Sequence, residues 1–280
     1  MNGLDPRPAN DQIMDRPNPA SAVPLLESAA SKPIAENSEL ATVLSDHGTL
    51  LYRDALPPRA MEEMEHMARE GFQRLVDHPD ICPSQHEFYS QYRSVIPFPL
   101  DVHLGTNFLQ VLALLGHSPI LPILERYFGT DDLVVPFGSM LARYVEPRSG
   151  DAPVEWRQDG YVTESTRLVT CWIPFSPCGF SAPGLKIALP SPLRIIDASE
   201  FPDRTADESR WHIWNPVCRR GDVILFDPFM LHGTHFHKQM RQPRYSLEVR
   251  VTSSEFVRDL PAERIHYIYD FSSGNITEAS

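Results

Sequence analysis

The chain has 280 residues, of which 42% are hydrophobic and 22% charged, proportions that are ordinary for a globular protein with a sizeable core. Its 37 acidic and 25 basic residues give a formal charge of −12, which argues against general nucleic-acid binding because that needs a basic surface. No apolar run approaches the roughly 20 residues that span a bilayer and no signal-peptide pattern opens the chain, so we expect neither a membrane protein nor a secreted one.

The cysteines give no sign of a disulfide framework or of a paired-cysteine metal site. They form no Cys-x-x-Cys pair, so zinc binding by Cys171 and Cys178 is the weaker interpretation. For so long a chain we expect the cysteines to be reduced thiols and the protein to be cytoplasmic. The four residues are Cys82, Cys171, Cys178 and Cys218.

Three segments are predicted from composition. Residues 1–38 are rich in proline and small polar residues and have no apolar period, so we expect a disordered N-terminal arm. Residues 39–272 are predicted to form a single domain. Residues 273–280 are predicted to be a frayed tail, although Tyr267, Tyr269 and Phe271 just before them should pack on the core.

The first half of the domain is predicted to be largely helical. After a short helix at 40–44 and a strand at 49–53, Pro57-Pro58 opens a helix to about Asp77 whose apolar residues recur at helical spacing. Thr106 is expected to cap a helix to Leu115, and Pro119 to start another that Gly129 ends. The irregular, aromatic stretch 79–105 between them is typical of a loop that walls a substrate site; it contains Phe88, Tyr89 and Tyr92.

From Leu133 onward the pattern changes to short β-rich runs separated by proline, glycine and charged turns. Several short strands at this spacing indicate an all-β barrel or jelly roll. The chain is therefore predicted to be mainly β with flanking helices (α+β). The expected strands are 134–135, 139–145, 168–174, 185–189, 222–226 and 245–251.

Two stretches of this β region carry candidate chemistry. The first is Gln158-Asp159-Gly160. The second runs from Gly221-Asp222 through a buried strand to His232-Gly233-Thr234 and then to Arg244 and Ser246. An acid-bearing motif, a histidine 73 residues later and an arginine 12 residues after that histidine form a distinctive order. This order is typical of mononuclear iron sites, where two ligands come from one strand and the third from a distant strand.

These segments resemble the phytanoyl-CoA dioxygenase (PhyH-like) family over roughly residues 40–253. The resemblance implies a double-stranded β-helix (cupin-like jelly roll) and an enzyme that uses Fe(II) and 2-oxoglutarate to oxidise a small molecule. It implies Asp159 and His232 as metal ligands and catalytic residues. It implies cosubstrate binding by the guanidinium of Arg244, which suits a carboxylate, and by Gln158, Thr234 and Ser246.

One position departs from the family. Arg157 stands where the family has the first histidine of its His-x-Asp motif, and a guanidinium offers only donors, so it cannot bind a metal. The sequence leaves three alternatives open. Water completes the coordination shell of the metal, another histidine (His103, His212 or His235) supplies the missing ligand, or an ion pair between Arg157 and Asp159 replaces the metal.

The leading interpretation is an oxygenase acting on a small, partly apolar molecule, including specialised metabolites. The alternative is a metal-free member of the fold, acting as a ligand-binding or regulatory protein or as an isomerase with Asp159 or His232 as a general base. His235 and His237 are expected in a solvated loop. The sequence leaves open whether the protein is a homo-oligomer.

Overall fold

The computed structural model describes residues 27–29, 37–80, 95–96, 100–101, 106–147, 156–160, 167–191, 193–196, 211–257, 260 and 267–278. Among these residues, no helix combines the length and the apolar character needed to cross a bilayer. Several residues considered above lie outside the described ranges, namely Cys82, Phe88, Tyr89, Tyr92 and His103.

The helices follow the predicted apolar pattern. The long helix α3 has a proline at its first position and buries Met61, Met64, Ala68, Phe72 and Leu75 on one face. Gly129, with φ of 72°, ends α6 in the left-handed conformation that favours glycine. The helices are α2 (Asn37–His47), α3 (Pro58–Asp77), α5 (Leu109–Gly116), α6 (Ile120–Phe128) and the short α8 (Ser254–Val257).

The predicted N-cap of this helix at Thr106 is wrong by two residues, because the observed N-cap is Phe108. Thr106 and Asn107 form strand β5, which pairs with β4 (Leu100–Asp101). Helix α5 begins at Leu109, and the backbone N–H of Leu109 donates to Oδ1 of Asn107 at 3.1 Å. The side-chain acceptor is therefore Asn107, a residue type as suited to this role as threonine.

In the part of the chain that is described, the strands form a ten-stranded sheet, a separate three-stranded sheet and the two-stranded pair β4–β5. The large sheet has the order β1-β2-β11-β8-β13-β6-β14-β15, with β7 paired to β13 and β3 paired to β7; the small sheet has the order β10-β9-β12. The strands are β1 (Glu27–Ala29), β2 (Thr49–Arg53), β3 (Val95–Ile96), β6 (Leu133–Pro136), β7 (Leu141–Val145), β8 (Val169–Pro174), β9 (Gly184–Leu189), β10 (His212–Trp214), β11 (Val223–Phe226), β12 (His232–His235), β13 (Arg244–Ser253), β14 (Tyr267–Asp270) and β15 (Ile276–Glu278).

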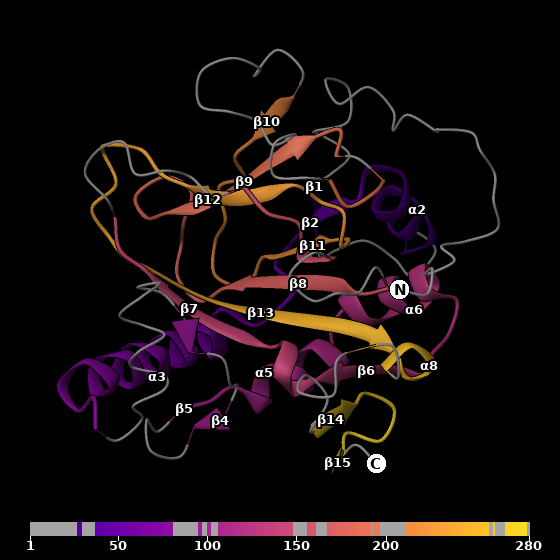
Figure 1. Ribbon diagram of the computed structural model, residues 1–280, viewed down its shortest axis with the longest axis horizontal. Coiled ribbons are helices and arrows are strands. Elements are labelled where there is room, and N and C mark those ends of the chain that lie inside the picture. Colours follow the sequence, from indigo (N-terminus) through magenta and orange to yellow (C-terminus); the bar gives the residue numbers. More distant parts are fainter. Residues whose placement is uncertain are drawn as a thin grey trace.

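The elements lie in three layers. In Figure 1 the small sheet lies above strands β8 and β13, and helices α3 and α5 lie below them. The odd-numbered residues of β13, such as Leu247 and Val249, pack with the helices in the main hydrophobic core. Because side chains alternate along a strand, Arg244, Ser246, Glu248 and Arg250 face the small sheet instead. The structure confirms the predicted class, mainly antiparallel β with flanking helices in a jelly roll.

A second hydrophobic cluster lies between the two sheets. We call this cluster, together with the polar side chains that face it, the barrel interior. Trp172 on β8 and Phe226 on β11 come from the large sheet, and Leu185 and Ile187 on β9 come from the small one. The polar groups described below therefore lie beside apolar side chains.

Both chain ends differ from the predicted boundaries. Strand β1 lies inside the predicted N-terminal arm and pairs in parallel with β2, with Glu27 opposite Leu51. Strand β15 lies inside the predicted frayed tail and forms a hairpin with β14, with Ile276 opposite Tyr269. Neither short strand has an apolar period of its own. Each is ordered instead by pairing with a neighbouring strand.

Candidate functional site

The segment 156–160 lies directly beside strand β12. Arg157 and His232 exchange two backbone hydrogen bonds of 2.9 and 3.0 Å, and the N–H of Gly160 donates to the carbonyl oxygen of Pro228 at 2.9 Å. A Cβ at position 160 would lie 2.7 Å from the end of the Ile195 side chain and 3.1 Å from the carbonyl oxygen of Pro228, so a larger residue would force these neighbours to shift. This pairing brings the Gln158-Asp159-Gly160 motif next to His232.

Gln158 belongs to the outer side of this segment. Its Nε2 donates to the carbonyl oxygens of Phe229 at 2.6 Å and Arg194 at 2.9 Å, and its Oε1 accepts from the N–H of Ile196 at 2.8 Å. The amide is thus engaged with the backbone on both of its polar atoms. The structure gives Gln158 a positioning role for the loops at 194–196 and 229, in place of the expected contact with a cosubstrate.

His232 is a buried, oriented imidazole. Its Nδ1 donates to the carbonyl oxygen of Met230 at 2.9 Å, so its Nε2 carries the lone pair. The ring packs on Phe226, with centroids 4.5 Å apart. Burial and the nearby Arg157 lower the pKa of His232 to about 4 and outweigh the attraction of Asp159, so the imidazole is neutral at pH 7.

Asp159 faces this imidazole, with its Oδ1 3.7 Å from Nε2 of His232. Its Oδ2 accepts hydrogen bonds from Nε of Arg250 at 3.0 Å and from the hydroxyl of Thr170 at 2.5 Å. Burial alone would raise the pKa of Asp159, but Arg250 holds it well below its usual range. Asp159 is therefore ionised. Two atoms that each lie about 2.0–2.2 Å from one ion are separated by about 3–4 Å, so this pair is spaced as two metal ligands are.

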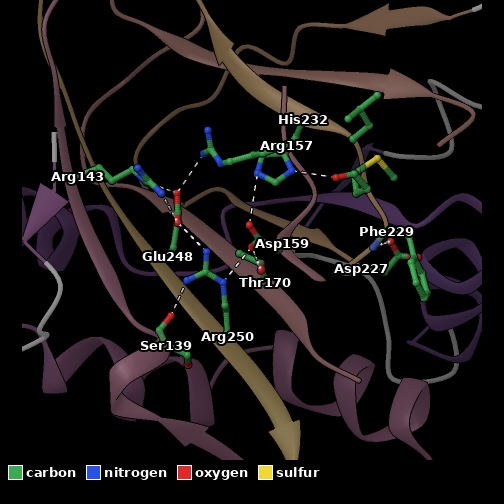
Figure 2. Close-up of polar contacts among 12 residues, drawn as sticks. Ser139, Arg143, Arg157, Asp159, Thr170, Asp227, Phe229, His232, Glu248 and Arg250 are labelled. Carbon is green, nitrogen blue, oxygen red and sulfur yellow. Dashed lines mark hydrogen bonds and ion pairs between the residues drawn. The ribbon is translucent and has the colours of Figure 1, made fainter. Parts of the chain in front are cut away.

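Glu248 is the centre of a second set of contacts, shown in Figure 2. It accepts two hydrogen bonds from Arg143, one of them 3.0 Å long, and a third of 3.0 Å from Nη2 of Arg250. Nη2 of Arg157 lies 3.7 Å from its Oε1. Burial would raise the pKa of Glu248, but the arginines lower it to about 2. Arg157 thus faces Glu248, whereas Asp159 is held by Arg250.

Arg244 lies deeper in the barrel interior, on the same face of β13. Its Nη1 donates to the carbonyl oxygen of Gly184 at 2.9 Å, and its guanidinium carbon lies 5.2 Å from the ring centre of Trp172. Burial lowers the pKa of Arg244 to about 10, which leaves it charged at pH 7. Within the described part of the chain, Nε of Arg244, Nε1 of Trp172 and Oγ of Ser246 are buried without a hydrogen-bond partner.

The remaining candidates are distributed between the two faces of the small sheet. Thr234 shares the face of His232, because it is two residues along β12. His235 lies on the opposite face, with its ring 5.9 Å from that of His237, and His212 is exposed on β10. Lys186 also lies on that outer side, 3.7 Å from the ring centre of Trp156. Among the described residues, none of these histidines is in contact with Asp159.

Sequence reasoning missed four residues of the site: Arg143, Thr170, Glu248 and Arg250. A signal for two of them was present, because polar residues alternate with apolar ones from Arg244 to Arg250, which places all the polar ones on one face. Arg143 and Thr170 come from separate strands whose pairing with β13 brings them close.

The fit to a metal is partial. Asp159 and His232 fit two ligand positions, and Arg157 cannot supply a third. Within the described residues, no group of three or more histidine, cysteine, aspartate or glutamate side chains is arranged to hold a metal ion. The buried donors on Arg244, Trp172 and Ser246 fit an anion such as the distal carboxylate of a keto acid.

Comparison with known proteins supports the fold. No protein-family model matches the sequence, and no curated protein matches it significantly. Among solved structures, the chain is similar to the non-heme alpha-ketoglutarate-dependent epimerase SnoN from nogalamycin biosynthesis, with 17% identity, a TM-score of 0.56 and coverage of 79% of this chain and 82% of that one.

Two further structures give the same result. The non-heme monooxygenase ThoJ, in complex with nickel, has 14% identity and a TM-score of 0.53, and covers 79% of this chain and 77% of its own. The non-heme alpha-ketoglutarate-dependent carbocyclase SnoK from nogalamycin biosynthesis has 14% identity and a TM-score of 0.51, with coverage of 77% and 83%. At these sequence identities the similarity shows the fold alone, so the activity of this chain has to be inferred from its own residues.

Proposed function

We propose that the protein is an Fe(II)- and 2-oxoglutarate-dependent enzyme that oxidises a small, partly apolar molecule such as a specialised metabolite. The observation that carries the proposal is the convergence of Asp159 and His232 in the barrel interior, with Nε2 and Oδ1 3.7 Å apart. Structures of similar fold include an epimerase, a monooxygenase and a carbocyclase, which supports a small-molecule enzyme. The finer assignment, a phytanoyl-CoA dioxygenase-like hydroxylation, depends on the sequence resemblance.

The surroundings of the two proposed ligands suit metal binding. The carbonyl of Met230 fixes the tautomer of His232, and Arg250 and Thr170 fix one oxygen of Asp159, so both side chains are oriented by outer contacts. Neither ligand has to lose a proton at pH 7 before it binds a cation. Fe(II) held there supplies oxidation by O2 coupled to the keto acid.

The cosubstrate is assigned to residues whose buried polar atoms have no partner in the described part of the chain. Arg244 binds the distal carboxylate through its guanidinium, and Ser246 and Trp172 donate to the same anion. Thr234 lies on the interior face of β12 and remains a proposed contact. The substrate is assigned to the apolar part of the barrel interior, which includes Trp172, Ile187, Trp214, Phe226 and Met230.

Anaerobic titration with Fe(II) and 2-oxoglutarate tests the proposal. We expect a visible charge-transfer band in the wild type and its loss in Asp159→Ala and His232→Ala. His235→Ala is the matched control, because this histidine lies on the outer face of the same strand and its removal should leave the band unchanged. A flat wild-type spectrum with no bound metal would reject the proposal.

A second candidate is favoured by Arg157. A guanidinium held 3.7 Å from Glu248 at the third ligand position supports a metal-free protein that binds a ligand or performs non-oxidative chemistry such as isomerisation. In that case His232 is the better general base, because its Nε2 lone pair is available while Asp159 has the lower pKa. Substrate turnover without O2 consumption, in protein with no metal by mass spectrometry, would establish this candidate over the first.

The proposed setting is the cytoplasm. Its support is the state of the cysteines, since Cys171, Cys178 and Cys218 all carry free thiols.

A further inference from the structure

The barrel interior contains more positive than negative charge. Among the described residues, four guanidiniums face two carboxylates: Arg143, Arg157, Arg244 and Arg250 against Asp159 and Glu248. His232 is neutral at pH 7, so it does not change this balance. Among the described residues two positive charges are therefore in excess, which is costly inside a protein unless something compensates them.

The excess charge belongs to particular residues. Arg250 contacts both carboxylates at 3.0 Å, and Arg143 makes two hydrogen bonds to Glu248. Arg157 approaches Glu248 only to 3.7 Å, beyond hydrogen-bond distance, and Arg244 has a backbone carbonyl as its partner. Of the four arginines described in the barrel interior, Arg157 and Arg244 are thus the two without a carboxylate at hydrogen-bond distance.

The same two arginines have unsatisfied donors. Nε of Arg157 and Nε of Arg244 are buried without a partner in the described residues, as are Nε1 of Trp172 and Oγ of Ser246. A buried donor left unpaired costs free energy, so a group of them calls for a ligand with acceptor atoms. Repulsion from Arg143 and Arg157 adds to burial in lowering the pKa of Arg244, which an incoming anion would reverse.

We propose that the barrel interior binds a dicarboxylate dianion without any metal ion, with Arg157 and Arg244 each holding one carboxylate. Arg157 occupies the position of the absent first histidine. Its positive charge then holds a carboxylate, as the metal ion would in a site with three protein ligands. Figure 2 shows its guanidinium directed toward Glu248 beside His232. The inference rests on the proposed function only in taking 2-oxoglutarate as the first dianion to test.

The experiment is calorimetric titration of chelator-treated, metal-free protein. We expect 2-oxoglutarate to bind, glutarate to bind because it has the same two carboxylates, and butyrate to bind at least about tenfold more weakly because it has one. Arg157→Gln and Arg244→Gln should each weaken 2-oxoglutarate binding by about tenfold or more, the loss of one charged hydrogen-bonding partner.

Arg220→Gln is the matched control, because Arg220 pairs with Glu65 away from the barrel interior. Binding of 2-oxoglutarate at wild-type affinity by Arg157→Gln, or binding only after metal is added, would overturn the inference. If Arg157→Gln does not fold, the wild-type titration with and without metal decides alone, and Arg157→Lys shows whether the charge suffices.

The two proposals can fail separately. Metal-free dicarboxylate binding without iron-dependent turnover would leave this inference standing and reject the proposed function. Iron-dependent binding and turnover, with no affinity for the keto acid in metal-free protein, would do the reverse.

Discussion

Arg157 faces Glu248, with Nη2 and Oε1 3.7 Å apart, whereas the neighbouring Asp159 is held by Arg250 at 3.0 Å. The arginine at the first-histidine position therefore does not neutralise the proposed ligand carboxylate by a direct ion pair.

Replacing that side chain should raise metal affinity. In Arg157→His we expect Fe(II) or Co(II) to bind at least about tenfold more tightly than in the wild type, because the variant removes a cation and adds an imidazole beside Asp159 and His232. Arg157→Gln is the matched control, since it removes the charge without adding a ligand. Equal metal affinity in the two variants, measured by competition with a chromogenic chelator, would show that position 157 does not reach the metal.

Arg250 should be the arginine on which stability most depends. Arg250→Met leaves Asp159 and Glu248 buried with fewer partners, and breaking such a buried pair typically costs about 3–5 kcal/mol. Urea unfolding measures this loss in the free energy of unfolding. The control Arg220→Met removes a partly exposed pair with Glu65, which should cost less than about 1 kcal/mol. Similar losses in both variants would contradict a central role for Arg250.

Glu248 should make stability depend on pH in acid. Its pKa is lowered from 4.5 to about 2 in the folded protein, so the unfolded chain binds the proton first and stability falls as pH decreases from about 5 toward 2. Between pH 5 and 3 this group should account for about 2 kcal/mol of the loss. Glu248→Gln should start less stable at pH 7 and show a shallower decline over the same window. Parallel stability curves for wild type and variant would argue that the pKa of Glu248 is the same in the folded and unfolded states.

Gln158 should affect stability more than cosubstrate binding. Gln158→Ala leaves two carbonyls and one N–H of the neighbouring loops without their partner, so we expect a loss of about 2–3 kcal/mol in the free energy of unfolding. Gln73→Ala, which removes an exposed contact with Asp77 on α3, is the matched control and should change little. An unchanged stability together with weaker 2-oxoglutarate binding would restore the original expectation for this residue.

Much of the fold could be predicted because local patterns agree with it. Pro58 and the apolar spacing of α3 define that helix, Gly129 ends α6, and the alternation along β13 separates a core face from an interior face. The strands that were missed, such as β1, β10 and β15, have three residues each and are ordered by a partner strand.

The site divides in the same way. The order of Asp159, His232 and Arg244 predicted which residues face the barrel interior, and the structure places these three there. Gln158 lies between Arg157 and Asp159, which both face the barrel interior, and its own side chain contacts the loops on the outer side, whereas the family resemblance suggested a contact with the cosubstrate. The contacts of Arg250 with Asp159, 91 residues apart, depend on which strands pair and in what register, which the sequence alone does not specify.

Strand β13 also sets the order in which the molecule can assemble on the ribosome. Arg143, Arg157 and Asp159 are synthesised long before Glu248 and Arg250, so their counter-charges arrive late. Until then hydration is the better environment for them, and closure of the two sheets over them would be unfavourable. The nascent chain should therefore stay open and sensitive to proteases until β13 emerges from the exit tunnel, and become protected in one late step.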